Sequence, residues 1–157
     1  MEVIILIGLQ AAGKSTFFRS HFALTHVHVS KDLLHNNRKP ARRQHQLIEE
    51  ALQAGRSVVV DNTNATREER ESLIALGHCY SAMVIGYYFE VQLRESLERN
   101  RSRQGKARVP EIAIFATLKR LARPSFEEGF DRLFSVRPLG NQTFEVGAWN
   151  EELLDDH

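Results

Sequence analysis

A glycine-rich segment near the amino terminus has the composition of a loop that binds phosphate. Residues 8–15 read Gly-Leu-Gln-Ala-Ala-Gly-Lys-Ser and match the pattern G-x-x-x-x-G-K-[ST] without a mismatch. Gly8 and Gly13 let successive backbone N–H groups turn toward phosphate oxygens, and the positive end of the following helix reinforces them. Lys14 would reach the β- and γ-phosphates, and the Ser15 hydroxyl would bind Mg²⁺. The segment therefore predicts a nucleoside-triphosphate site.

Two carboxylates each follow a short apolar run elsewhere in the chain. Asp61 comes directly after Val58–Val60, a run typical of a buried strand, and an acid in that place commonly acts on Mg²⁺, directly or through water. Asp32 follows the run Val27–Val29 and could take a proton from an attacking hydroxyl. Asp32 has a structural alternative, since it could stabilise a helix start. Asn62–Asn64, which follow Asp61, could fix substrate or loop geometry or could form a turn.

A basic segment in the second half of the chain has the composition of a lid over polyphosphate. Residues 99–108 contain one glycine and five cations between two predicted helices, namely Arg99, Arg101, Arg103, Lys106 and Arg108. An arginine of such a loop can stabilise the charge that spreads over a transferred phosphoryl group. Alternatively, any single one of these cations could lie in solvent at the margin of the lid without contacting phosphate.

The elements that must position these residues alternate between strands and helices. We predict strands over 2–8, 27–29, 57–60, 82–89 and 132–136, an edge piece over 143–146, a brief helix over 32–35, and helices over 15–24, 42–54, 66–76, 92–101 and 110–122. This alternation predicts an α/β fold of the P-loop NTPase type, a three-layer sandwich around a central, mainly parallel β-sheet with a helical or loop lid. The ligand crevice of such a sheet lies at the carboxyl ends of its strands.

Composition and charge limit the class of protein. The 157 residues are 42% hydrophobic and 26% charged, which is typical of one globular domain, so 1–157 is predicted to be a single domain with a lid at about 99–110 and an acidic tail at about 147–157. The net charge of +1 excludes a basic nucleic-acid coat. Val3–Leu9 is too short to cross a bilayer, so no membrane partner is expected. Because the chain has one cysteine, Cys79, an internal disulfide is excluded and a cytoplasmic location is favoured. Cys79 itself is expected to be a small buried apolar residue.

Taken in order, these motifs resemble the kinase domain of the 5′-hydroxyl polynucleotide kinase family, which includes phage, bacterial and animal end-healing enzymes. The matching residues fall within about 3–137 and comprise Gly8–Ser15, Ser30–Asp32, Val60–Asn64, Arg99-Asn100, Val109-Pro110 and Glu128–Phe130. Only the first motif is highly specific by itself; the others gain specificity from their order and spacing. The resemblance implies a P-loop kinase that transfers the γ-phosphate of ATP, with Mg²⁺, to the 5′-hydroxyl of an RNA or DNA end.

The resemblance also implies roles for individual residues. The catalytic group would be Lys14, Asp32 as the general base, and Arg103 as the lid arginine. Mg²⁺ would bind Ser15 and also Asp61, directly or through water. The phosphates of ATP would contact Gly8, Ala11, Ala12, Gly13, Lys14, Ser15, Thr16 and Arg103. The acceptor would contact Asp32, His35, Arg38, Asp61, Thr63 and Asn64.

Two departures from the family pattern leave alternatives open. The lid has one extra residue before Val109, so Arg101 or Arg108 could take the role of Arg103. His35 stands where some members have an arginine that binds the phosphate next to the acceptor nucleotide, and residues 36–39 could substitute for it.

Two other functions are compatible with the same loop: a kinase of a small hydroxylated metabolite, and a nucleotide-binding switch without phosphotransfer. No side chain is identifiable as a reader of the 2′-hydroxyl, so the sequence does not separate RNA from DNA. No phosphatase or ligase segment accompanies the kinase motifs, so partner activities in end healing are expected on other chains.

Overall fold

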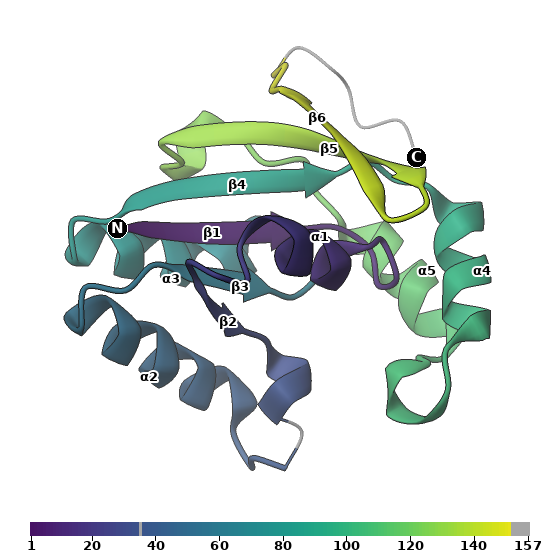
Figure 1. Ribbon diagram of the computed structural model, residues 1–157, viewed down its shortest axis with the longest axis horizontal. Helices are drawn as coiled ribbons and strands as arrows, with labels where there is room; N and C mark the ends of the chain where they lie inside the picture. Colours follow the sequence, from purple (N-terminus) through teal and green to yellow (C-terminus); the bar gives the residue numbers. More distant parts are fainter. Residues whose placement is uncertain (35, 152–157) are drawn as a thin grey trace.

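A central β-sheet organises the protein, whose computed structural model describes residues 1–34 and 36–151. Within these residues six strands pair in the order β2–β3–β1–β4–β5–β6 (Figure 1). Their bounds are β1 (Glu2–Ile7), β2 (Val27–Val29), β3 (Val58–Asp61), β4 (Met83–Phe89), β5 (Arg132–Gly140) and β6 (Thr143–Ala148). The first five are parallel and β6 is antiparallel to β5. The predicted α/β class with a mainly parallel sheet is therefore confirmed.

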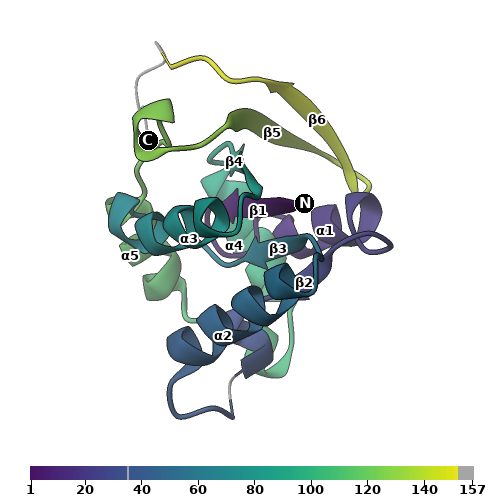
Figure 2. The same cartoon turned by 90° about the vertical axis from the view of Figure 1, so that its left-hand side faces the viewer.

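Helices cover both faces of the sheet, but unequally. The α-helices are α1 (Lys14–His21), α2 (Pro40–Gln53), α3 (Arg67–Cys79), α4 (Leu93–Ser102) and α5 (Glu111–Arg120), and the 3₁₀ turns are η1 (Lys31–Leu34), η2 (Gly105–Ala107) and η3 (Phe126–Glu128). Helices α3 and α5 lie on one side of the sheet and α1 lies on the other (Figure 2). Side chains of α2, α3 and α5 pack in one apolar cluster, whereas those of α1 pack in a second cluster. Phe144 of β6 joins the α1 cluster, so the β5–β6 hairpin completes a layer that α1 covers only in part.

The central strand β1 has the burial expected of a strand with a layer on each side. Val3, Ile5 and Ile7 enter the cluster with α2 and α3, while Ile4 and Leu6 enter the cluster with α1. None of these side chains is more than 1% exposed. Such two-sided burial explains why this stretch is continuously apolar rather than alternating.

Some boundaries differ from those predicted. Helix α2 begins at Pro40, two residues early, because proline fits the first turn of a helix. β6 extends to Ala148, and the Arg123 guanidinium lies 4.3 Å from the Trp149 ring centroid. Residues 147–151 thus belong to the folded part, and the rest of the expected acidic tail lies outside the described residues. The expectation for Cys79 is wrong, because this residue ends α3 and is exposed.

Among the described residues, no helix combines the length and the apolar character needed to cross a bilayer.

Candidate active site at the carboxyl edge of the sheet

The phosphate-binding loop leaves the carboxyl end of β1 and leads into α1. Gly13 has φ +95°, and a Cβ there would lie 3.2 Å from the Phe144 ring, so this position requires glycine on both conformational and steric grounds. Gly8 leaves no room for a Cβ either, because one would come within 2.9 Å of the Cβ of Phe89. The Gly8 N–H donates to the Thr63 carbonyl at 3.0 Å, which ties the loop to the segment after β3.

Lys14 lies folded over this loop with its ammonium buried. Its Nζ donates to the Gly8 carbonyl at 2.9 Å and to the Leu9 carbonyl at 2.6 Å. Burial lowers the pKa of Lys14 to about 8, the nearby Asp61 and Asp32 carboxylates oppose that shift, and Arg103 adds to it. These three charged residues come from separate segments, so the fold brings them all within electrostatic range of Lys14.

Asp61, at the end of β3, is the centre of a short polar chain. Its Oδ2 accepts a hydrogen bond from Ser15 Oγ at 2.7 Å and lies 2.8 Å from Nε2 of His28. Burial alone would raise the pKa of Asp61, but the hydrogen bonds from His28 and Ser15, with the charge of Lys14, outweigh it and hold the pKa below its usual range. The carboxylate is therefore ionised at neutral pH.

The oxygen atoms of Ser15 and Asp61 suit Mg²⁺. A hydroxyl and an ionised carboxylate 2.7 Å apart are hard donors, and Mg²⁺ commonly takes one or two such protein oxygens together with substrate phosphates and water. Ser15 belongs to the phosphate-binding loop and is exposed, whereas Asp61 is buried.

His28 is a residue of this chain that the sequence reasoning gave no role. It lies in β2, stacks on Phe18 with ring centroids 4.1 Å apart, and reaches Asp61 across the β2–β3 pair. The parallel register that places Val29 beside Val60 brings the two side chains together. No spacing rule in the sequence gives that register, although a histidine within a short apolar run that ends just before Ser30 was a usable signal.

Asp32 lies on η1, directly beyond β2, and its side chain is exposed. Its backbone N–H donates to Ser30 Oγ at 3.2 Å, and the N–H of Lys31 donates to Oδ1 of Asn62 at 2.9 Å. The Asn62 amide in turn donates to Oε1 of the buried Gln44 in α2 at 2.6 Å. The turn that carries Asp32 is thus fixed to the segment after Asp61.

Asn64 joins the carboxyl ends of β1 and β3 through its side-chain amide. It has φ +45°, and its buried amide donates to the Leu6 carbonyl at 2.7 Å and to the Val60 carbonyl at 3.3 Å. Sequence reasoning placed Asn64 with the acceptor contacts; in the structure its side-chain amide is buried against the carbonyls of Leu6 and Val60. Thr63 itself is half-buried and follows Asn62 at the site edge.

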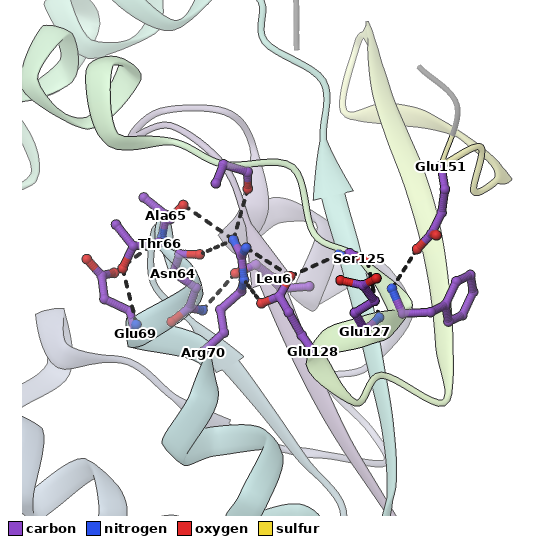
Figure 3. Close-up of polar contacts among 12 residues, drawn as sticks. Leu6, Asn64, Ala65, Thr66, Glu69, Arg70, Ser125, Glu127, Glu128 and Glu151 are labelled. Atoms are coloured by element: carbon purple, nitrogen blue, oxygen red, sulfur yellow. Dashed lines mark hydrogen bonds and ion pairs between the residues drawn. The ribbon is translucent and has the colours of Figure 1, made fainter. Parts of the chain in front are cut away.

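Arg70 supports this segment through a buried network (Figure 3). Its Nη1 donates to the carbonyls of Asn64 and Ala122, each at 3.0 Å. Nε and Nη2 pair with the two carboxylate oxygens of Glu128 at 2.8 and 3.1 Å. Arg70 is 0% exposed, so every part of the guanidinium depends on these partners. The Glu128–Phe130 motif therefore has a structural reason, which sequence alone did not supply.

The segment predicted to be a lid begins with two residues that contact different parts of the chain. Arg99 donates from Nη1 to the Ala11 carbonyl of the phosphate-binding loop at 2.7 Å. Asn100, 0% exposed, donates to the Val109 carbonyl at 2.7 Å and accepts from the Val109 N–H at 2.9 Å. This reciprocal pair closes residues 101–108 into a loop, which explains why an Arg-Asn pair and a Val-Pro pair bracket it.

The remaining lid cations differ in their surroundings. Arg101 forms an exposed ion pair with Glu111, its Nη2 3.0 Å from Oε1. Arg103 is half-buried, donates weakly to the Ala107 carbonyl at 3.4 Å, and influences Lys14. Arg108 is exposed. Of the three alternatives, Arg103 is the one whose charge lowers the pKa of Lys14.

The other predicted site residues occupy several places. Ala11 and Ala12 are buried within the loop, and the Thr16 hydroxyl accepts from Arg19 at 3.1 Å on α1. Arg38 lies in a hollow beside η1 and α2. His35 lies outside the described residues.

The fold and this site define a P-loop kinase domain. Residues 3–124 match the AAA domain family, and the chain belongs to that family. It is 29% identical to a bifunctional polynucleotide phosphatase/kinase of Schizosaccharomyces pombe, over 86% of this chain and 33% of that protein. It is 28% identical to a putative bifunctional polynucleotide phosphatase/kinase of Acanthamoeba polyphaga mimivirus, over 99% of this chain and 35% of that protein. The chain thus spans about a third of these relatives, and they confirm the resemblance drawn from the motifs.

Solved structures share the fold at low identity. The Chaetomium thermophilum Kti12 complex with ADP-AlF3 matches with a TM-score of 0.71 and 17% identity, over 86% of this chain and 88% of that one. A fungal RNA kinase matches with a TM-score of 0.64 and 17% identity, over 89% of this chain and 76% of that one. A gluconokinase from Sinorhizobium meliloti 1021 matches with a TM-score of 0.63 and 21% identity, over 90% of this chain and 85% of that one. At these identities the likeness shows the fold alone.

Proposed function

We propose that this protein transfers the γ-phosphate of ATP to the 5′-hydroxyl of an RNA or DNA strand. The observation that carries the proposal is geometric: Ser15 of the phosphate-binding loop donates to Asp61 at 2.7 Å, and the turn that carries Asp32 is fixed to the next residue, Asn62, by a hydrogen bond of 2.9 Å. The two relatives named as polynucleotide phosphatase/kinases support the choice of acceptor. The partners proposed are a nucleoside triphosphate and, transiently, a 5′-hydroxyl end.

In this proposal the chain binds the donor before it acts on the acceptor. Backbone N–H groups of the loop and Lys14 hold the β- and γ-phosphates, while Ser15 and Asp61 hold the metal ion. Bound Mg²⁺ neutralises charge on the phosphate oxygens. Arg103 stabilises the negative charge that spreads over the equatorial oxygens during transfer.

The acceptor hydroxyl is positioned from the other side. Asp32 orients the 5′-hydroxyl in line with the γ-phosphorus and receives its proton as the new O–P bond forms. The bond between the γ-phosphorus and the bridging oxygen breaks, and ADP leaves with that electron pair. Most of the acceleration comes from placement and from fixed charges rather than from covalent chemistry by the protein.

An acceptor panel tests the proposal. The protein would be incubated with γ-labelled ATP, Mg²⁺ and either 5′-hydroxyl RNA, the matched DNA, or a sugar or sugar acid. The same oligonucleotides with a 5′-phosphate are the matched controls, because they lack only the attacking hydroxyl. We expect label on the 5′-hydroxyl strands and none on the controls. Label on the sugar compounds alone would replace this proposal with a small-metabolite kinase, a class that shares the fold.

A further inference from the structure

His28 connects two elements that flank the phosphate-binding loop. It is the middle residue of β2, and its Nε2 lies 2.8 Å from Oδ2 of Asp61 at the end of β3. Its ring stacks on Phe18 of α1, with centroids 4.1 Å apart and an angle of 15° between the planes. One side chain thus contacts both the helix that follows the loop and the carboxylate beside it.

Helix α1 also contacts this carboxylate directly. Ser15 and Phe18 are three residues apart on α1, so their side chains lie on one face of the helix. Ser15 Oγ donates to Oδ2 of Asp61 at 2.7 Å, and this is the oxygen that His28 also contacts. The terminal torsion of an aspartate side chain is broad and roughly two-fold, so a carboxylate with one partner can exchange its two oxygens. Two donors on Oδ2, from α1 and from β2, select one of these orientations.

The chemistry of the two groups gives the direction of the hydrogen bond between His28 and Asp61. An ionised carboxylate only accepts hydrogen bonds, so Nε2 of His28 carries the hydrogen and donates it. The Asp61 side chain is 5% exposed and the His28 side chain is 25% exposed. Water therefore has little access to the carboxylate, and losing this donor would leave part of its charge without compensation. The buried Phe18 lies flat against the imidazole and limits rotation of the ring.

We propose that His28 is a positioning residue, which holds the Asp61 carboxylate in the orientation in which it and Ser15 bind Mg²⁺. The inference rests on the part of the proposed function that assigns the metal ion to Ser15 and Asp61. His28 acts through Asp61 and does not itself bind the ion, because its Nε2 hydrogen is directed at the carboxylate. Partners that orient a metal ligand in this way contribute about 10- to 100-fold in metal affinity or activity.

Three substitutions separate the hydrogen bond from the packing. The side-chain nitrogen of glutamine is as many bonds from Cα as Nε2 of histidine, whereas that of asparagine is one bond closer. His28→Gln can therefore still donate to Asp61, and His28→Asn falls short of it, while both lose the stack on Phe18. His28→Phe makes the opposite change, since it keeps a ring against Phe18 and has no donor.

The measurement is calorimetric binding of ADP at a series of Mg²⁺ concentrations, with no acceptor present. His28→Phe and His28→Asn should raise the Mg²⁺ concentration that gives half of the full effect on ADP affinity by about 10-fold or more. His28→Gln should recover most of this loss. Affinity for ADP in the presence of a chelator should be the same in all four proteins, because the loop and Lys14 are unchanged. Urea unfolding without nucleotide and Mg²⁺ checks that each variant is folded.

A second measurement uses the wild type alone and needs neither metal nor nucleotide. Nitrogen NMR of the labelled imidazole of His28 should show a hydrogen on Nε2. A hydrogen on Nδ1 alone would overturn the inference, because Nε2 could then not donate to Asp61.

The outcomes separate this inference from the function on which it rests. The same Mg²⁺ dependence in all four proteins, or an equal loss in His28→Gln and His28→Asn, would overturn the role of His28 alone. ADP binding by the wild type that does not respond to Mg²⁺ would overturn both this role and the metal site of the proposed function. The expected pattern without phosphorylation of any oligonucleotide would support His28 and contradict the proposed acceptor.

Discussion

In the proposed reaction the site has a donor half and an acceptor half, and the chain holds the residues of the two halves differently. On the donor side Lys14 and Asp61 are buried, and their polar atoms are engaged by the loop carbonyls, Ser15 and His28. On the acceptor side Asp32 is exposed on a 3₁₀ turn, and residues 36–39 are exposed too. The first half is built into the ends of β1 and β3, whereas the second is attached to them through Asn62.

This difference indicates where specificity resides. The geometry of the buried donor half follows from the strand ends and a glycine-rich loop. Such a half suits a ligand that proteins of this fold bind in the same way. An exposed acceptor half can change its side chains without disturbing the sheet. Changes on the donor side are therefore expected to affect folding or all transfer, and changes on the acceptor side to affect the choice of acceptor.

The largest expected effect concerns the support beneath the donor half. The substitution Arg70→Met leaves Glu128 buried without its partner and should lower the free energy of unfolding by about 3–5 kcal/mol. Urea denaturation followed by circular dichroism would measure it. The control is Arg120→Met, which removes the ion pair with Glu69, whose side chains are 54% and 35% exposed. That change should cost less than about 1 kcal/mol, and equal losses in the two variants would show that Arg70 is not a support.

The second prediction separates the lid arginines. Arg103→Ala should lower kcat by about 10²- to 10³-fold, because a donor to the developing charge is lost while the loop still binds nucleotide. Arg101→Ala should change kcat little, since Arg101 already pairs with the exposed Glu111. Steady-state kinetics of both variants give the comparison. A large loss in Arg101→Ala with none in Arg103→Ala would reassign the role.

The smallest expected effect is a pH dependence of nucleotide binding. The pKa of Lys14 is about 8 without nucleotide, and bound phosphates raise it, so binding takes up a proton above that pH. Affinity for ADP should be constant below pH 7 and weaken by up to about tenfold per pH unit above pH 8. Calorimetry in buffers of different ionisation enthalpy would detect the proton. Affinity that is constant to pH 9.5 would contradict the burial of an ionisable Lys14.

The lowered pKa of Lys14 also makes the free energy of unfolding depend on pH. Unfolded chains hold the Lys14 proton up to pH 10.5, whereas the folded chain releases it near pH 8. The unfolded state therefore binds more protons between these values, and the contribution of Lys14 to stability rises with pH across this window.

The sequence predicted the strands and the loop between β1 and α1 because their signals lie in consecutive residues. The loop at 8–15 and the acid after Val58–Val60 are local signals, and strands buried on both faces are visible as continuous apolar runs. Contacts set by register or by distant segments were not accessible. The His28–Asp61 contact depends on the β2–β3 pairing, and the Arg70–Glu128 pair joins positions 58 residues apart. The charge of Arg38–Arg43 was visible, but its concave arrangement required the start of α2 at Pro40.

The most direct test of the account separates nucleotide binding from transfer in two variants. Asp32→Asn keeps the shape of the acceptor half but loses the base, so it should bind ATP with a dissociation constant within about twofold of the wild type. Its transfer of label to a 5′-hydroxyl oligonucleotide should fall by about 10²-fold or more. Lys14→Ala should lose both binding and transfer. Wild-type turnover by Asp32→Asn would contradict the assignment of the base and the division of the site into two halves.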